Sequence, residues 1–287
     1  MRIYLNNKFV DEKKAVISVL DHGFLYGDGV FETLRAYQGR LFRLDEHLKR
    51  LIKSAQGLEI SIPHTLPEFR RLLHETLLVN HLKNALLRIC ISRGYGPIGL
   101  DPALCRKPTI VIIPRVFNGY NPGQYHDGLK IAIVSVRRTP REVLDPQIKS
   151  ANFLNNVLAK IQAKRKRADE GLMLAVNGYL TEGSISNLFI VRRGRLYTPT
   201  VTLGILAGIT RGLVIDLAKQ ADVTVKETRL RPSDLYKADE CFLTNTSMEI
   251  MPVAKADGAR VGNGKPGPVT RLLHEAYQDQ VRLECRI

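Results

Sequence analysis

The stretch Gln147–Asn156 constrains the fold most, because it puts one lysine beside an apolar periodic segment. Its apolar residues, and those just after it, have the spacing of one helix face: Phe153, Leu154, Val157, Leu158 and Ile161. This predicts a helix with one buried stripe and Lys149 at its inner end. A partly desolvated lysine forms a Schiff base with an aldehyde, whereas a solvated one stays protonated. Both interpretations stay open on this stretch alone.

Length and composition are those of an ordinary globular enzyme. The chain has 287 residues, 44% hydrophobic and 25% charged, which excludes a disordered or fibrous protein. No run reaches the length of a bilayer span, and the N-terminus begins in strand-like alternation, so we expect a cytoplasmic protein without a membrane partner. The four cysteines lack the spacing of a disulfide framework or zinc site, and we expect no metal.

The formal net charge of +15 raises the question of an anionic partner. The densest basic run, Lys164–Arg167, falls at the end of the predicted helix, where cations complement the helix dipole. No nucleic-acid-binding module accompanies it. We therefore expect small-molecule substrates, and a basic nucleic-acid-binding protein is only a remote alternative.

The order of the elements predicts two domains. Residues 1–118 form a smaller α+β domain, with strands and helices in separate groups. Its elements are expected near residues 2–10, 14–20, 30–37, 44–55, 67–79, 85–92 and 109–116. A glycine-rich loop is expected at 21–29. Turn-forming residues then predict a linker at 119–128, and a buried-strand pattern opens a larger domain at 129–287.

Five motifs occur in order along the chain: Asp21-His22-Gly23, Lys149-Ser150, Glu182-Gly183-Ser184-Ile185-Ser186-Asn187-Leu188-Phe189, Gly208-Ile209-Thr210-Arg211 and Thr244-Asn245-Thr246-Ser247. Together they resemble the fold-type IV pyridoxal-phosphate enzymes, which include branched-chain aminotransferases, D-amino-acid aminotransferases and aminodeoxychorismate lyases. The resemblance runs nearly end to end. It implies a two-domain α+β fold whose larger C-terminal domain has a barrel-like β core, and pyridoxal 5'-phosphate as cofactor.

The resemblance also implies roles for single residues. Lys149 would hold the cofactor as a Schiff base and carry a proton between the substrate and the cofactor, and Glu182 would keep the pyridine nitrogen protonated. Independently, the helix start at Gly208–Thr210 favours an anion such as the cofactor phosphate. The family match extends the cofactor-binding set to Arg50, Ser186, Asn187, Leu206, Ile209, Thr210 and Thr246.

Arg88 is the first candidate for binding the substrate α-carboxylate, because its planar guanidinium suits a carboxylate, although a strand-edge ion pair is the alternative. The other substrate candidates are Tyr26, Thr33, Arg35 and Ser247. The chain departs from the branched-chain enzymes at four positions. These are Thr33 for glycine, Leu86 and Phe153 for tyrosines, and Ser186 for an acidic residue.

The resemblance predicts a transaminase that moves an amino group between a D-amino acid or branched-chain L-amino acid and a 2-oxo acid such as 2-oxoglutarate or pyruvate. Residues 94–102 and 257–271 look like the transaminases. Thr33 and Asn245 are typical of the lyases, so pyruvate elimination giving 4-aminobenzoate stays the alternative. A homodimer is also implied. The sequence does not fix the handedness of the amino donor.

Overall fold

The computed structural model describes residues 1–287, which divide into two compact units. Unit 1 comprises residues 1–118, 148–153 and 281–287, and unit 2 comprises residues 119–147 and 154–280. The domains predicted from the sequence are each continuous in the chain. In the structure, two later segments belong to unit 1, and the first of them, residues 148–153, carries Lys149. No helix combines the length and apolar character that a membrane span requires.

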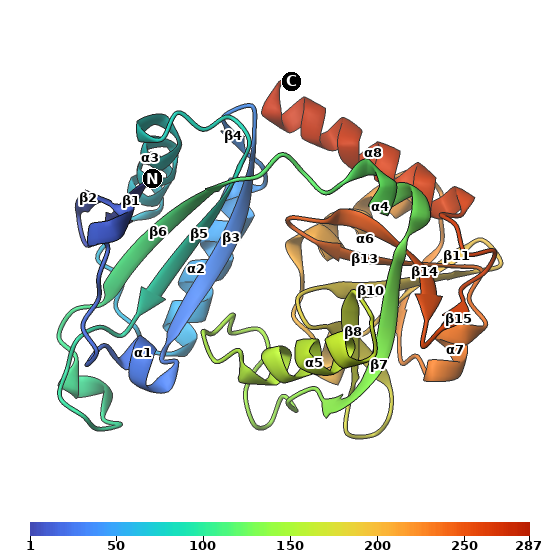
Figure 1. Cartoon of the computed structure of the whole chain (residues 1–287), viewed down its shortest axis with the longest axis horizontal. Helices are drawn as coiled ribbons and strands as arrows, with labels where there is room; N and C mark the ends of the chain where they lie inside the picture. The colour runs from blue at the N-terminus through green and yellow to red at the C-terminus, as the bar shows by residue number, and fades with distance from the viewer. The chain divides into compact units, whose positions relative to one another are not determined.

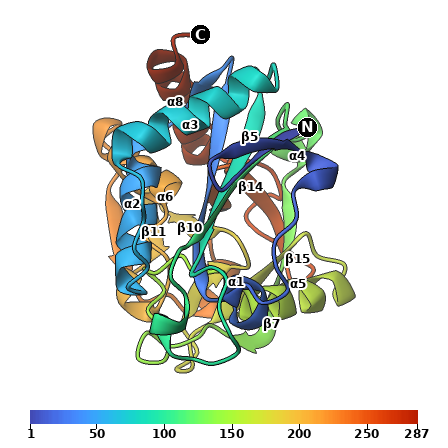
Figure 2. The same ribbon diagram turned by 90° about the vertical axis from the view of Figure 1, so that its left-hand side faces the viewer.

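Unit 1 is built on a six-stranded antiparallel sheet with the order β2-β1-β6-β5-β3-β4. The strands are β1 (Arg2–Leu5), β2 (Lys8–Asp11), β3 (Gly29–Tyr37), β4 (Arg40–Leu41), β5 (Ala85–Ser92) and β6 (Thr109–Val116). Helices α2 (Leu44–Gly57) and α3 (Leu66–Val79) pack on this sheet (Figures 1 and 2). Their apolar stripes, which include Leu48 and Leu73, meet Leu34 and Leu87 of the strands in one fully buried core.

Local sequence signals account for the helix ends of unit 1. Helix α3 starts with a capping box, in which the Thr65 hydroxyl accepts from the Glu68 N–H and the Glu68 carboxylate accepts from the Thr65 N–H. The predicted glycine-rich loop instead contains the short helix α1 (His22–Tyr26), a correction to the sequence reading. The Asp21 side chain caps its start, and Gly27 ends it in the left-handed region with φ +69°.

Unit 2 contains a closed β-barrel. Strand β9 pairs with both β8 and β10, so the series β10-β13-β14-β7-β8-β9 returns to β10, and β11, β12 and β15 extend it. The strands are β7 (Leu129–Arg137), β8 (Glu170–Leu174), β9 (Leu180–Gly183), β10 (Asn187–Arg192), β11 (Arg195–Pro199), β12 (Val225–Thr228), β13 (Glu240–Asn245), β14 (Glu249–Ala256) and β15 (Ala259–Arg260). Leu188, Leu243 and Met251 are completely buried in its core. The predicted barrel-like core is confirmed.

The helices of unit 2 are α4 (Pro122–Asp127), α5 (Leu154–Arg165), α6 (Ile209–Gln220), α7 (Pro232–Tyr236) and the first part of α8 (Pro268–Cys285). Three of them lie between its strands, whereas α4 precedes the first strand and α8 follows the last.

Short 3-10 helices lie at Glu12–Lys14, Pro102–Leu104 and Val201–Leu203. The strand predicted at residues 14–20 is wrong, because residues 15–20 form no helix or strand and Val16, Ile17 and Val19 are exposed.

The predicted position of Lys149 at a helix mouth is wrong. Helix α5 begins only at Leu154, and residues 148–153 lie instead along the start of β3. The Phe31 N–H donates to the Lys149 carbonyl (3.0 Å), and the Ala151 N–H donates to the Gly29 carbonyl (2.7 Å). Backbone pairing with a buried strand, rather than a helix, therefore holds the lysine.

The predicted buried stripe of α5 is also wrong, because Leu154, Val157, Leu158 and Ile161 are 41 to 66% exposed. The buried face carries Asn156, Ala159 and Ala163 instead. Helix α5 approaches β8 so closely that a Cβ on Gly171 would lie 2.7 Å from the Ala159 carbonyl oxygen. Only small side chains fit at this contact, so the larger apolar residues face outward.

Candidate active site

One face of the unit 1 sheet carries three of the predicted substrate residues. Side chains alternate along β3, so Phe31, Thr33 and Arg35 share one face while Glu32 points to the other. Arg88 on β5 lies directly opposite Thr33 in the antiparallel register, and its side chain therefore shares the face of Thr33.

The ring of Phe31 contacts two charged side chains and one aromatic ring, and we call Phe31, Lys149, Arg88 and Phe153 the Phe31 cluster. The Lys149 Nζ lies 4.3 Å from the centroid of its ring, and the Arg88 guanidinium carbon lies 3.8 Å from the same centroid. Both contacts are cation–π interactions. Phe153 packs edge-on against the ring, with 5.3 Å between the centroids. Phe31 was not predicted as a site residue. The alternation of side chains along β3 could have placed it on the same face as Thr33 and Arg35.

The opposite face of β3 holds a buried charged cluster. Glu32 is fully buried and accepts two hydrogen bonds from Arg50, at 2.5 Å from Nε and 2.9 Å from Nη2. It also accepts from Nδ1 of the buried His47 at 2.7 Å. Burial alone would raise the pKa of the Glu32 carboxyl, but Arg50 and His47 outweigh it and lower the pKa to about 2. Glu32 therefore fixes the direction of the Arg50 guanidinium.

Replacing Glu32 with glutamine is expected to lower the free energy of unfolding by about 3 to 5 kcal/mol, because it leaves Arg50 without its buried counter-charge. The matched control is Asp45→Asn, which breaks the exposed two-point pair between Asp45 of α2 and Arg70 of α3 and should cost at most about 1 kcal/mol. Urea unfolding at pH 7 measures both. Equal losses of unfolding free energy in the two variants would contradict a stabilising role for the buried Glu32–Arg50 pair.

The Glu32 cluster also makes stability depend on pH. Its carboxyl has a pKa of about 2 in the folded protein, below the ordinary value of 4.5. Its contribution is therefore complete above pH 4.5 and is lost as the pH falls from 4.5 towards 2. The difference between the two pKa values corresponds to about 3 kcal/mol of unfolding free energy. Urea unfolding of Glu32→Gln between pH 4.5 and pH 2 should lack this pH-dependent loss.

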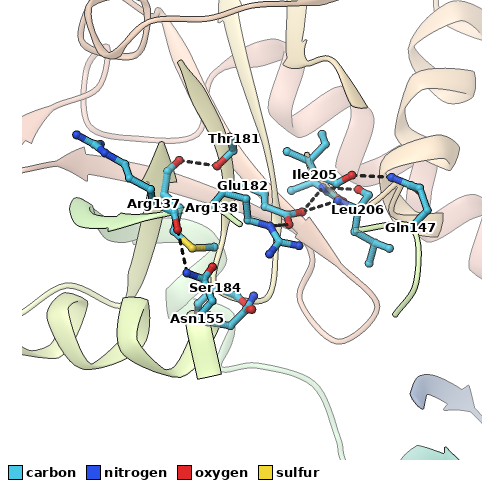
Figure 3. A network of polar contacts seen from close by, with 12 residues as sticks. Arg137, Arg138, Gln147, Asn155, Thr181, Glu182, Ser184, Ile205 and Leu206 are labelled. Atoms are coloured by element: carbon cyan, nitrogen blue, oxygen red, sulfur yellow. Dashed lines mark hydrogen bonds and ion pairs between the residues drawn. The ribbon is translucent and has the colours of Figure 1, made fainter. Parts of the chain in front are cut away.

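In unit 2, Glu182 at the end of β9 is buried and held by three donors (Figure 3). Its Oε1 accepts from Arg138 Nε at 2.7 Å, and its Oε2 accepts from the Leu206 N–H at 3.0 Å and from Asn187 Nδ2 at 3.2 Å. Gln147 binds the Ile205 carbonyl and the Ala207 N–H, and so fixes the loop on either side of Leu206. This is a rigid, ion-paired carboxylate, and sequence reasoning missed Arg138, which directly follows the end of β7.

The start of α6 suits a phosphate group. Its N-cap is Gly208, and no side chain caps the first turn, which contains the predicted Ile209 and Thr210. A Cβ on Gly208 would lie only 2.1 Å from Asn187 Oδ1, so glycine alone fits there. The uncapped N–H groups and the helix dipole favour an anion. The predicted donor set and the site therefore fit a phosphate-bearing cofactor.

The remaining predicted residues take different places. Ser186 is buried and donates to Glu170 Oε2 at 3.3 Å, away from Glu182 itself. Thr246 and Ser247 lie on a turn in which Asn245 Oδ1 accepts from the Ser247 and Met248 N–H groups. Tyr26 lies on α1, where its hydroxyl accepts from the Gly99 N–H at 3.1 Å, and it is not part of the Phe31 cluster.

Comparison with known proteins identifies the family. Residues 29–256 match the family model of amino-transferase class IV. The chain belongs to the class IV aminotransferases. It is 50% identical to a putative branched-chain-amino-acid aminotransferase of Methanocaldococcus jannaschii, over 97% of this chain and 96% of that protein. It is 34% identical to a D-alanine aminotransferase of Staphylococcus haemolyticus, with 98% of each covered.

Two further relatives of this class IV aminotransferase bear on its chemistry. An aminodeoxychorismate lyase of Bacillus subtilis is 36% identical, over 98% of this chain and 94% of that protein. The branched-chain amino acid aminotransferase of Thermobaculum terrenum, solved in its PLP form, superimposes with a TM-score of 0.88 at 29% identity, covering 99% of this chain and 94% of that one. The predicted family, fold type, transaminase class and cofactor are thus confirmed.

Proposed function

We propose that this aminotransferase transfers an amino group from a branched-chain L-amino acid to 2-oxoglutarate, with pyridoxal 5'-phosphate as cofactor. The observation that carries the proposal is the Phe31 cluster. It holds a lysine amine and a carboxylate-binding guanidinium on one ring, at 4.3 and 3.8 Å from its centroid. The apolar rings of Phe31 and Phe153 beside them suit a branched aliphatic side chain. The relative from Methanocaldococcus jannaschii supports the same substrate class.

Each residue then has a defined task. Lys149 would hold the cofactor through its amine, and the same amine is the group that would carry the proton of the substrate α-carbon. The bound cofactor supplies the electron sink for this step. Glu182, held by Arg138, keeps the pyridine nitrogen protonated. Arg88 orients the substrate carboxylate.

The phosphate set consists of the first N–H groups of α6, Thr246 and Arg50. Ser186, Asn187 and Leu206 act through the Glu170 and Glu182 carboxylates. Thr33, Arg35, Tyr26 and Ser247 remain candidates for substrate contact. Of these, Thr33 and Arg35 share the Arg88 face of the sheet.

The half-reaction with single amino acids tests the substrate. Purified holoenzyme mixed with L-leucine or L-valine is expected to lose the absorbance of the aldehyde cofactor and to gain that of the aminated form. Adding 2-oxoglutarate should reverse the change. The control is D-alanine, which should react at least tenfold more slowly. If D-alanine, but neither L-leucine nor L-valine, converted the cofactor to its aminated form, the amino donor would be a D-amino acid and the proposed donor would be wrong.

A lyase is the second candidate, because Thr33 and Asn245 are typical of that branch and a lyase is among the relatives. A lyase eliminates pyruvate and retains the aldehyde form of the cofactor. Pyruvate and 4-aminobenzoate formed from aminodeoxychorismate, with no amination by L-leucine, would establish this alternative and reject the transaminase proposal.

We further propose that the chain acts as a homodimer in the cytoplasm. The support is the exposed apolar stripe of α5, Leu154, Val157, Leu158 and Ile161, which a second copy would cover. All four cysteines are unpaired, as in reducing compartments. Sedimentation of a single 32.3 kDa species would contradict the dimer, and cell fractionation tests the compartment.

A further inference from the structure

Unit 2 has a cavity of about 290 Å³ apart from the site described above, formed by α4, β14 and the first turns of α8, elements labelled in Figure 1. None of its lining residues belongs to the cofactor or substrate set. Its volume lies at the lower limit of ordinary ligand pockets, so a ligand of one small ring would fill it.

The polar lining of this cavity is basic. Its ionisable lining residues include His126, Lys265, Arg271 and His274, and no acidic residue lines it. Lys265 and His126 both bind Asp127, whereas Arg271 donates only to the carbonyl of Pro266 and has no carboxylate partner. Arg271 is therefore the cation that remains for an anionic ligand.

Thr270 lines the cavity, but its hydroxyl is not open to it. The hydroxyl oxygen is closed to solvent and has no hydrogen-bond partner, so a ligand in the cavity does not reach it. Glu240 accepts from the Thr270 N–H at 2.7 Å and so fixes the residue at the start of α8. Arg271, which follows it, is therefore the group that would bind an anion in the cavity.

The other wall of the cavity is flat and largely apolar. The rings of Tyr125 and His274 stack with 4.9 Å between centroids and 11° between planes, and Pro252 lies beside them. We propose that the cavity binds a small organic carboxylate with a flat apolar body, its carboxylate bound by Arg271 and its body packed on the Tyr125–His274 stack.

Both rings of this stack form polar contacts with residues 248 and 249, where the turn after β13 leads into β14. The Tyr125 hydroxyl donates to the Met248 carbonyl at 3.3 Å, and His274 Nε2 lies 3.3 Å from Glu249 Oε2. That turn carries Thr246 and Ser247. If the proposed function holds, a ligand on the stack would therefore alter cofactor or substrate affinity, a consequence that rests on that function, whereas the binding site itself does not.

Calorimetric titration of the holoenzyme with 4-iodobenzoate tests the site, and the iodine anomalous signal in a soaked crystal locates the probe. Arg271→Gln is expected to weaken binding at least tenfold, as loss of a charge-assisted contact does. Thr270→Val should bind the probe as the parent does, because the hydroxyl that it removes is closed to the cavity. The control, the exposed Arg195→Gln on β11, should bind as the parent does.

Three results would overturn the proposal. They are equal affinity in the parent and Arg271→Gln, equal binding of 4-iodobenzylamine, and iodine density outside this cavity. Inorganic phosphate separates the two parts of the ligand. It should bind at least tenfold more weakly, and equal affinity would contradict the flat apolar body. Binding is read without turnover, so these results are independent of the transaminase assay.

Discussion

Replacing Lys149 with alanine is expected to lower kcat by on the order of 10⁴-fold or more, the loss typical of removing a covalent catalytic group. Alanine provides neither the amine that binds the cofactor aldehyde nor a group to carry the α-proton. The fold should persist, because the Lys149 segment is held through its backbone. Its N–H donates to Ser54 Oγ at 3.1 Å, and its carbonyl accepts from the Phe31 N–H at 3.0 Å.

Borohydride reduction followed by mass spectrometry gives this prediction a readout apart from activity. The parent chain should gain the mass of one reduced cofactor, and Lys149→Ala should gain none. The control is Lys53→Ala, an exposed lysine of α2, which should label and turn over as the parent does. Covalent labelling of Lys149→Ala would mean that another lysine binds the cofactor.

Replacing Glu182 with glutamine is expected to lower kcat by on the order of 10² to 10³-fold, as for loss of one preorganised electrostatic group at a reacting centre. A neutral amide does not stabilise a protonated pyridine nitrogen, so the electron sink weakens. Glutamine keeps one acceptor oxygen, so it retains the hydrogen bond either from Arg138 or from the Leu206 N–H, and its amide NH2 faces the other donor. The effect should therefore fall on kcat more than on KM.

The matched control for Glu182 is Glu227→Gln. Glu227 also forms an ion pair with an arginine in unit 2, Arg211, but it is not among the proposed site residues. Steady-state kinetics should give a kcat for this control within about twofold of the parent value, which is the range expected of surface substitutions. A rise in KM at constant kcat in Glu182→Gln would show that Glu182 contributes only binding.

The candidate site could be predicted from the sequence where a residue belongs to one of the ordered motifs. Lys149, Glu182 and Gly208–Thr210 were predicted in this way. The residues that hold them were not. Arg138 and Phe31 act through contacts with groups 44 and 118 positions away in the chain, respectively, and no local periodicity records such contacts.

By itself, the sequence indicated the family through its ordered motifs, and it indicated most of the helices and strands through local propensity and periodicity. Only the tertiary structure decided that Lys149 lies along β3 and that the large apolar residues of α5 face outward. Both outcomes depend on packing between distant segments. Ala159 and Gly171 allow a closer helix–sheet contact than leucines would, and this overrides the apolar spacing of the helix.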